Sequence, residues 1–152
     1  MMNDARKPLG QPEAVSPPGK LAYATPSTAP LVAGRRSFFK YRDLGVTAAS
    51  SGKMRAQVTI GADGMTQPTG WHYHVCDFQI VIMMKGWAKF MYEDKVTLVE
   101  AGDVVHQRPG MVHYLFDYSP DMEYLEIVSP ADFGSVLAEP ATVNVPPVTP
   151  WK

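Results

Sequence analysis

Short apolar segments, cut at regular intervals by turn residues, run through the centre of this 152-residue chain. Over residues 54–60, apolar residues alternate with Arg, Gln and Thr, which is the two-residue period of a half-buried strand. Similar runs follow at residues 78–84, 87–92, 95–99, 104–105, 111–116 and 122–128. Gly, Pro and Asp residues separate them, as is typical of turns, and at most one helical turn is expected, near Leu137. The pattern predicts an all-β sandwich or barrel.

Proline is concentrated at the two ends of the chain. Six of the 14 prolines fall in residues 1–30 and four in residues 139–152. Because proline lacks a backbone donor and fixes φ, it is excluded from helix interiors and central strands. We therefore expect a proline-rich N-terminal arm over residues 1–34, a barrel over residues 35–137 and a proline-rich tail over residues 138–152. The arm is either flexible or an extended segment that pairs with a partner subunit's sheet edge.

Charge and hydropathy exclude several partners. The formal net charge of −1 gives no overall basic field for nucleic acid or an anionic membrane. The longest wholly apolar stretch, residues 80–84, is too short for a transmembrane helix. Arg35-Arg36 resembles a twin-arginine export signal, but Arg42 and Asp43 lie where such a signal needs an apolar segment. We expect a cytoplasmic protein with no nucleic-acid or membrane partner.

Three of the four histidines have the spacing of metal ligands. His72 and His74 would point to the same side of a strand, so that both imidazoles can meet one ion. His113 follows a Pro109-Gly110 turn that would return a separate strand past this pair. Such a nitrogen-rich site suits one divalent ion per chain, of Fe, Ni, Co, Mn, Cu or Zn. Taken alone, His-x-His is a weak signal, and the alternative is two surface or hydrogen-bonded histidines.

The residues around these histidines resemble the two motifs of the cupin superfamily. The first motif corresponds to Gly70, His72, His74, Gln79 and Gly86, and the second to Gly102-Asp103, Pro109-Gly110 and His113. The resemblance covers about residues 53–130. It implies a small antiparallel jelly-roll barrel (a double-stranded β-helix) with a metal near its centre, and a homodimer.

Gln79 stands where the family pattern has a glutamate ligand. Its amide offers a neutral oxygen donor and cannot act as a general base. A site of His72, His74, His113 and Gln79 would leave the charge of the metal uncompensated, which favours an anionic substrate. Asp77 is the rival fourth ligand. A site without metal, in which Gln79 is a buried hydrogen-bonding residue, is the other alternative.

The parity of the strands also predicts what surrounds the site. Residues on the same strand faces as Gln79 and His113 would line the pocket, namely Val81, Met83 and Leu115. The pocket is therefore expected to be mainly apolar. Glu126 alternates with apolar neighbours and is expected to face solvent, and His106 is expected to be a rim histidine. Cys76, the one cysteine, excludes an internal disulfide and is expected to be a packed residue.

Two functions follow from this site. The first is a mononuclear metalloenzyme, with Fe(II)-type dioxygenase-like chemistry on a small organic substrate. The second is a non-catalytic cupin that binds or senses a small molecule or a metal, which the missing glutamate base favours. An isomerase or sugar-modifying enzyme without metal is a further possibility. It would need a histidine with a partner carboxylate in the pocket, and the sequence shows none clearly.

Overall fold

Antiparallel strands account for nearly all the regular structure of residues 19–65 and 68–138, which are the residues that the computed structural model describes. One short helix, α1 (Val46–Ala49), accompanies them. The strands are β1 (Leu31–Val32), β2 (Phe39–Asp43), β3 (Arg55–Gly61), β4 (His72–Val75), β5 (Phe78–Lys85), β6 (Trp87–Tyr92), β7 (Lys95–Glu100), β8 (Val104–His106), β9 (His113–Tyr118), β10 (Glu123–Ser129) and β11 (Gly134–Leu137). The predicted all-β antiparallel fold is confirmed.

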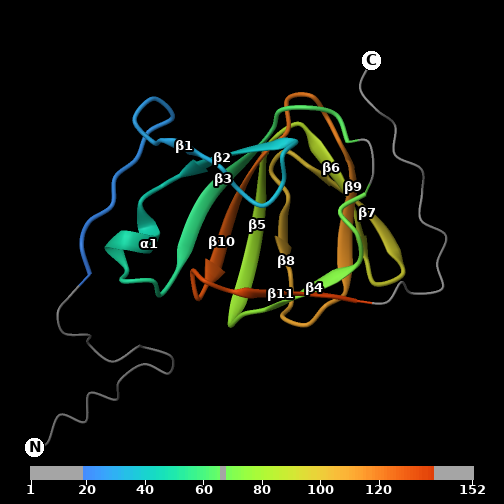
Figure 1. The fold of residues 1–152 in the computed structure, drawn as a ribbon. Coiled ribbons are helices and arrows are strands. Elements are labelled where there is room, and N and C mark those ends of the chain that lie inside the picture. The colour runs from blue at the N-terminus through green and yellow to red at the C-terminus, as the bar shows by residue number, and fades with distance from the viewer. Residues whose placement is uncertain (1–18, 66–67, 139–152) are drawn as a thin grey trace, which may run out of the picture.

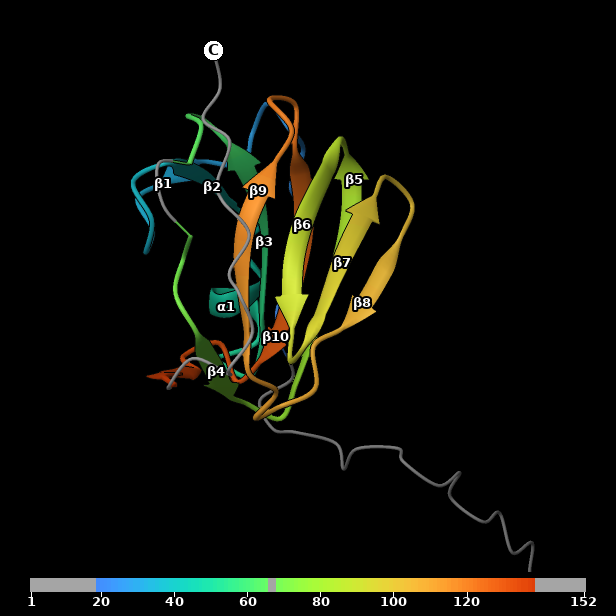
Figure 2. The same cartoon turned by 90° about the vertical axis from the view of Figure 1, so that its right-hand side faces the viewer.

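Two sheets face each other and enclose the interior (Figure 1). The larger sheet has the strand order β1-β2-β3-β10-β5-β8, and the smaller one has the order β11-β4-β9-β6-β7. Strands distant in sequence are neighbours in both sheets, as in a jelly roll: β10 pairs with β3 and β5, and β9 pairs with β4 and β6. Figure 2 shows β9, β6 and β7 side by side, with β4 at one end of the barrel.

Apolar side chains from both sheets form the main core. The cluster contains Phe39, Tyr41, Met65, Val81, Met83, Ala88, Phe90, Val99, Leu115, Tyr118, Met122 and Tyr124. Burial of such side chains stabilises the fold by roughly 1.5–3 kcal/mol for each large one. Five members of this cluster also line the cavity described below: Phe39, Tyr41, Phe90, Leu115 and Tyr124. The core therefore forms part of the wall of the functional site.

Most of the expected strands and turns are present, and two local expectations need correction. Residues near Leu137 form β11 rather than a helical turn, because they pair antiparallel with β4, with Leu137 opposite His72. Leu31–Val32 lies within the expected arm of residues 1–34, yet it pairs with β2 of the same chain. Residues 1–18 and 139–152 lie outside the described residues, so the expected arm and tail stay predictions. Within the described ranges no helix is long and apolar enough to cross a membrane.

Candidate metal centre

Three histidines from two strands converge inside the barrel. His72 and His74 lie on β4, two residues apart on one face, and His113 begins β9 as the direct cross-strand partner of His72. Their candidate ligand atoms all lie within 4.8 Å of one another, and all three residues are buried. The rings are packed closely, with centroid distances of 5.0 Å for His72–His74, 4.5 Å for His72–His113 and 4.9 Å for His74–His113. The expected grouping of the three histidines is therefore present in the structure.

Backbone carbonyls determine the tautomer of two of these histidines. The Nδ1 atom of His72 lies 2.7 Å from the Gly70 carbonyl oxygen, and that of His113 lies 2.8 Å from the Met111 carbonyl oxygen. A carbonyl oxygen only accepts hydrogen bonds, so each Nδ1 must carry the proton. Each Nε2 then has an unprotonated lone pair, which is the form that a metal ion needs.

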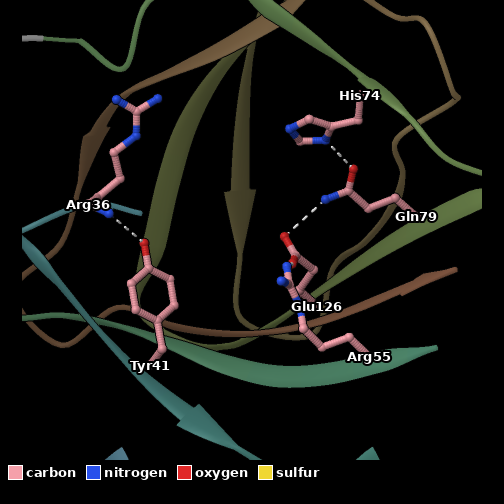
Figure 3. Close-up of polar contacts among 6 residues, drawn as sticks. All are labelled: Arg36, Tyr41, Arg55, His74, Gln79 and Glu126. Atoms are coloured by element: carbon pink, nitrogen blue, oxygen red, sulfur yellow. Dashed lines mark hydrogen bonds and ion pairs between the residues drawn. The ribbon is translucent and has the colours of Figure 1, made fainter. Parts of the chain in front are cut away.

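Gln79 gives His74 the same tautomer through a side-chain network (Figure 3). The Gln79 amide nitrogen donates to Glu126 Oε2 at 2.9 Å, and Arg55 Nη2 donates to Glu126 Oε1 at 2.7 Å. Because the carboxylate takes the amide N–H, the amide oxygen of Gln79 is turned to His74 Nδ1, at 2.5 Å. His74 therefore donates from Nδ1. Both ends of the Gln79 amide are used in this network.

Glu126 is buried in the barrel, so the expectation that it faces solvent is wrong. Its exposed fraction is 9%, and it lines the cavity. The pairing of the strands explains this position: on β10 Glu126 lies directly between Gln57 of β3 and Val81 of β5. Its diagonal neighbours include Arg55 and Gln79, which long side chains can reach across a sheet. The buried positions of β10 are Tyr124, Glu126 and Val128, so the strand does alternate, but Glu126 lies on its inward face.

Burial keeps the three imidazoles neutral. Desolvation lowers the pKa of His72 to about 4 and that of His113 to about 3, and it lowers the pKa of His74 as well. Neighbouring positive charge, including that of Arg35 and Arg36, acts in the same direction on His72. Near neutral pH all three rings are therefore unprotonated at Nε2, as ligands for a divalent ion must be.

Gln107 is a second buried glutamine at the site, and sequence reasoning did not single it out. Its exposed fraction is 5%, and its amide nitrogen lies 3.4 Å from His113 Nε2. Its amide oxygen is buried without a hydrogen-bond partner among the described residues. Three neutral imidazoles, with a buried amide next to one of them, are a donor set that a divalent transition metal accepts, so the residues present fit such an ion. The only signal in the sequence is the position of Gln107 two residues before Pro109 of the second motif.

The cavity beside the histidines has a volume of about 200 Å³. Its polar lining includes Arg35, Arg36, Arg55, Gln57, Thr59, Thr69, Gln107 and Glu126. The expectation of a mainly apolar pocket is therefore wrong, because the polar faces of β3 and β10 point into the cavity. Leu115 lines it as expected, whereas Val81 and Met83 do not reach it and pack in the main core instead.

The remaining candidates lie away from the three histidines. Asp77 is exposed, and its carboxylate accepts a hydrogen bond from the Ser129 hydroxyl at 3.3 Å. His106 is exposed on β8. Cys76 is half-buried, and desolvation raises the pKa of its thiol, which keeps it protonated. None of these three residues lines the cavity in the described part of the chain.

Comparison with known proteins agrees with this architecture. Residues 56–123 match the family model of the AraC-like ligand binding domain. Among solved structures, the chain is similar to Pac13 from Streptomyces, a nucleoside dehydratase also solved with uridine. The identity is 15%, with 78% of this chain and 92% of that chain covered at a TM-score of 0.55. No curated protein matches the sequence significantly.

Two Thermotoga maritima proteins have the same fold. One is a predicted oxalate decarboxylase, 21% identical, with 67% of this chain and 91% of that chain covered at a TM-score of 0.54. The other is a cupin-like protein, also 21% identical, with 69% and 82% covered at a TM-score of 0.52. At such identities the likeness establishes the fold, and the chemistry has to be argued from the residues of this chain.

Proposed function

We propose that this chain, whose residues 56–123 match the AraC-like ligand binding domain and whose fold is that of a cupin-like protein, is a mononuclear metalloenzyme acting on a small organic molecule. His72, His74 and His113 would hold one divalent ion per chain. The observation that carries the proposal is the shared tautomer: all three Nδ1 atoms face acceptors, so each Nε2 atom has its lone pair, and that of His113 meets only a long 3.4 Å contact from the Gln107 amide nitrogen. A cavity of about 200 Å³ beside them offers room for a small substrate.

Gln79 acts in this proposal as a positioning residue. As a fourth ligand, Gln79 would have to turn its amide oxygen away from His74 Nδ1. The hydrogen bond from its amide nitrogen to Glu126 holds the amide in its present orientation. Holding the His74 ring in the right orientation and tautomer is the role that its contacts support. Gln107 has its amide nitrogen near His113 and an amide oxygen without a hydrogen-bond partner among the described residues, so it is better placed to meet an ion or a ligand of that ion.

Dioxygenase-like chemistry on an Fe(II)-type ion is the reaction that we propose for this ligand set. When bound, such an ion would supply the activation of dioxygen, with both oxygen atoms entering the substrate. The protein's contribution is to present three neutral donors, so that the ligands do not offset the charge of the ion. Phe90 and Leu115 supply apolar wall around the reacting centre and limit the entry of water.

Glu126 favours a second candidate, an acid–base reaction such as elimination. It is the carboxylate that the sequence did not place in the pocket, and it is coupled to His74 through Gln79. Pac13, which is similar in fold, is a nucleoside dehydratase. However, both Glu126 oxygens are already engaged, one by Arg55 and the other by Gln79, so the carboxylate is occupied by protein donors. The metal-dependent reaction therefore remains our first proposal.

A non-catalytic binding role is the other candidate, and the match to a ligand binding domain supports it. Metal analysis of protein purified without chelator or added metal separates these functions, when it is followed by oxygen uptake with a panel of small organic acids. We expect about one ion per chain and oxygen uptake that requires both ion and substrate. Absence of metal would overturn the metalloenzyme. Stoichiometric metal without turnover would overturn the enzyme in favour of the binding module.

The cellular setting completes the proposal. We place the protein in the cytoplasm as a homodimer. The homodimer rests on the family resemblance, and the cytoplasmic location on the residues that follow Arg35-Arg36. Fractionation of cells that express the natural gene would test the location, and an exported pool would overturn it.

A further inference from the structure

The cavity wall carries more positive than negative charge. Arg35, Arg36 and Arg55 all line the cavity, and Glu126 is the single carboxylate among the described residues of its lining. Guanidinium groups stay protonated under all ordinary conditions. Since the three imidazoles are neutral near pH 7, the described lining has an excess of two positive charges before any metal binds.

The three arginines differ in their hydrogen-bond and ion-pair partners. Arg55 is paired with Glu126, with 2.7 Å between Nη2 and Oε1. Within residues 19–65 and 68–138, no carboxylate lies within ion-pair distance of Arg35 or Arg36. Arg36 donates from Nη2 to the Thr69 carbonyl oxygen at 3.0 Å, which uses only one of its five N–H groups. Two guanidiniums are therefore left without a charge partner at the cavity.

The Phe133 ring contacts the guanidinium groups of Arg35 and Arg55. The Cζ atoms of Arg55 and Arg35 lie 4.9 Å and 5.4 Å from the centroid of the Phe133 ring, within the range of cation–π attraction. The same ring lies 4.9 Å from that of His74. Phe133 thus lies in contact with Arg35, Arg55 and His74, and it connects these two arginines to the proposed metal centre.

A hydrogen bond to Tyr41 also positions the backbone of Arg36. Its N–H donates to the Tyr41 hydroxyl at 3.3 Å (Figure 3). Gly34 lies so close to the Tyr41 ring that a Cβ atom would overlap with it, and only glycine allows this approach. Figure 3 draws Arg36 and Tyr41 together, opposite His74 and Gln79 in this view. Arg36 is half-buried and Arg35 is exposed, and both line the mouth of the cavity with contacts that orient them.

We propose that Arg35 and Arg36 bind the carboxylate of a small organic acid whose other end reaches the three histidines. The planar guanidinium fork matches a carboxylate in two parallel hydrogen bonds. A volume of about 200 Å³ limits the ligand to a compact molecule. This inference rests on the proposed function and names its substrate class. It also gives the Arg35-Arg36 pair a role inside the barrel.

Calorimetric titration with benzoate and its neutral counterpart benzamide tests the inference without any substitution. Both would be titrated into metal-free protein and into protein loaded with one equivalent of Co²⁺. We expect benzoate to bind at least tenfold more tightly than benzamide in both forms. The preference should fall as salt is raised from 50 to 500 mM, because the partly exposed arginines are screened. Equal affinities for the two compounds would overturn the inference.

Substitutions identify the groups responsible. Arg35→Gln and Arg36→Gln should each weaken benzoate binding at least fivefold and change benzamide binding less than twofold. Arg42→Gln is the matched control, because it removes the same charge from β2 at a position outside the cavity lining. Circular dichroism and thermal melting establish that each variant is folded. A folded double variant of Arg35 and Arg36 that binds benzoate like the wild type would overturn the assignment.

Metal loading distinguishes this inference from the proposed function. A preference for benzoate in a protein that takes up no metal would leave the arginine site standing and overturn the metalloenzyme. Stoichiometric metal without any preference for benzoate would do the opposite. A preference that appears only with Co²⁺ would show that the ion binds the carboxylate, and it would overturn the role given to the arginines.

Discussion

Two buried glutamines decide the hydrogen-bond chemistry of the site at the scale of single residues. Gln79 is bound at both ends of its amide, whereas Gln107 has an unpaired oxygen. Gln79 therefore orients His74, whereas the amide oxygen of Gln107 can still accept a hydrogen bond from a ligand or coordinate an ion in the cavity. The cupin resemblance pointed to Gln79 through its motif position, but it could not show which atoms that side chain contacts. Those contacts depend on Glu126, whose position in the sequence lies far outside the first motif.

Gln79→Glu should destabilise the metal-free protein in a pH-dependent way. The introduced carboxylate would lie within hydrogen-bond distance of Glu126, where two charges cannot coexist and one group must take a proton. A carboxyl pKa raised in the folded state gives stability that is present at low pH and lost as the pH rises. We expect a loss of about 2 kcal/mol at pH 8 and a smaller loss at pH 5, measured by urea unfolding.

The exchanged pair Gln79→Glu with Glu126→Gln is the matched control for that experiment. It restores one carboxylate and one amide at adjacent positions, so part of the lost stability should return. A single Gln79→Glu variant as stable as the wild type at pH 8 would contradict the network drawn here.

Metal-free protein should also lose stability as the pH falls from 6.5 towards 4. The pKa of His72 is lowered to about 4 and that of His113 to about 3, so between these values and 6.5 the unfolded chain binds protons that the folded chain does not. Stability that is complete above pH 6.5 therefore decreases on acidification. Thermal melting of the wild type and of a His72→Phe, His113→Phe double variant measures the effect. An equally steep decrease in the double variant would assign it to other groups.

At the scale of elements, alternation in the sequence located the strands but could not say which face of each strand is inside. Arg55, Gln57 and Thr59 of β3 look like a solvent face, yet all three line the cavity. A two-residue period separates the two faces of a strand without saying which face is inside. Where the interior holds a polar cavity, the inward face is the polar one. Their inward orientation becomes evident only from the register with β10, which places Gln57 beside Glu126. For the same reason the sequence predicted that His72 and His74 share a face, but it did not predict that Glu126 lies inside the barrel with them.

Gly86, at the junction of β5 and β6, should tolerate no side chain. Its φ is 64°, and an added Cβ would lie 2.5 Å from Asp121 Oδ1 and would also overlap with the Ser119 hydroxyl. Gly86→Ala should cost about 2–4 kcal/mol, from backbone strain and overlap together. Gly102→Ala is the control, because its φ is 95° and no heavy atom lies within 4 Å of the added Cβ. It should cost about 1 kcal/mol by thermal melting. Equal costs for the two variants would contradict the close packing at Gly86.

At the scale of the whole molecule, the space between the two sheets contains both an apolar core and the polar cavity. The alternation of short strands was enough to predict the architecture, and the motif spacing was enough to group the three histidines. The charge of the cavity was not predictable, because Arg35 and Arg36 precede the first long strand and reach the site through contacts with Tyr41 and Phe133. Such contacts between distant segments leave no periodic signal.

We predict that the protein is a homodimer in solution. Both sheets end in edge strands with exposed apolar residues, including Val96 and Leu98 of β7 and Val104 of β8, and pairing or covering such edges is the usual way to protect them. Light scattering coupled to size exclusion should give twice the mass of one chain. Val104→Lys should increase the monomer fraction, with Lys40→Arg, at an exposed position of β2, as the neutral control. A monomer at all micromolar concentrations would contradict the prediction.

The central claim is that three histidines with a common tautomer hold one metal ion, and metal affinity tests it most directly. Wild type, His113→Ala and His106→Ala would be dialysed against the same buffered Co²⁺ and analysed by mass spectrometry of the bound metal. His106 is the control, since it is exposed and lies outside the cluster. We predict about one ion per chain in the wild type and in His106→Ala, and an affinity at least a hundredfold weaker in His113→Ala. Full metal content in His113→Ala, or none in the wild type, would contradict the account.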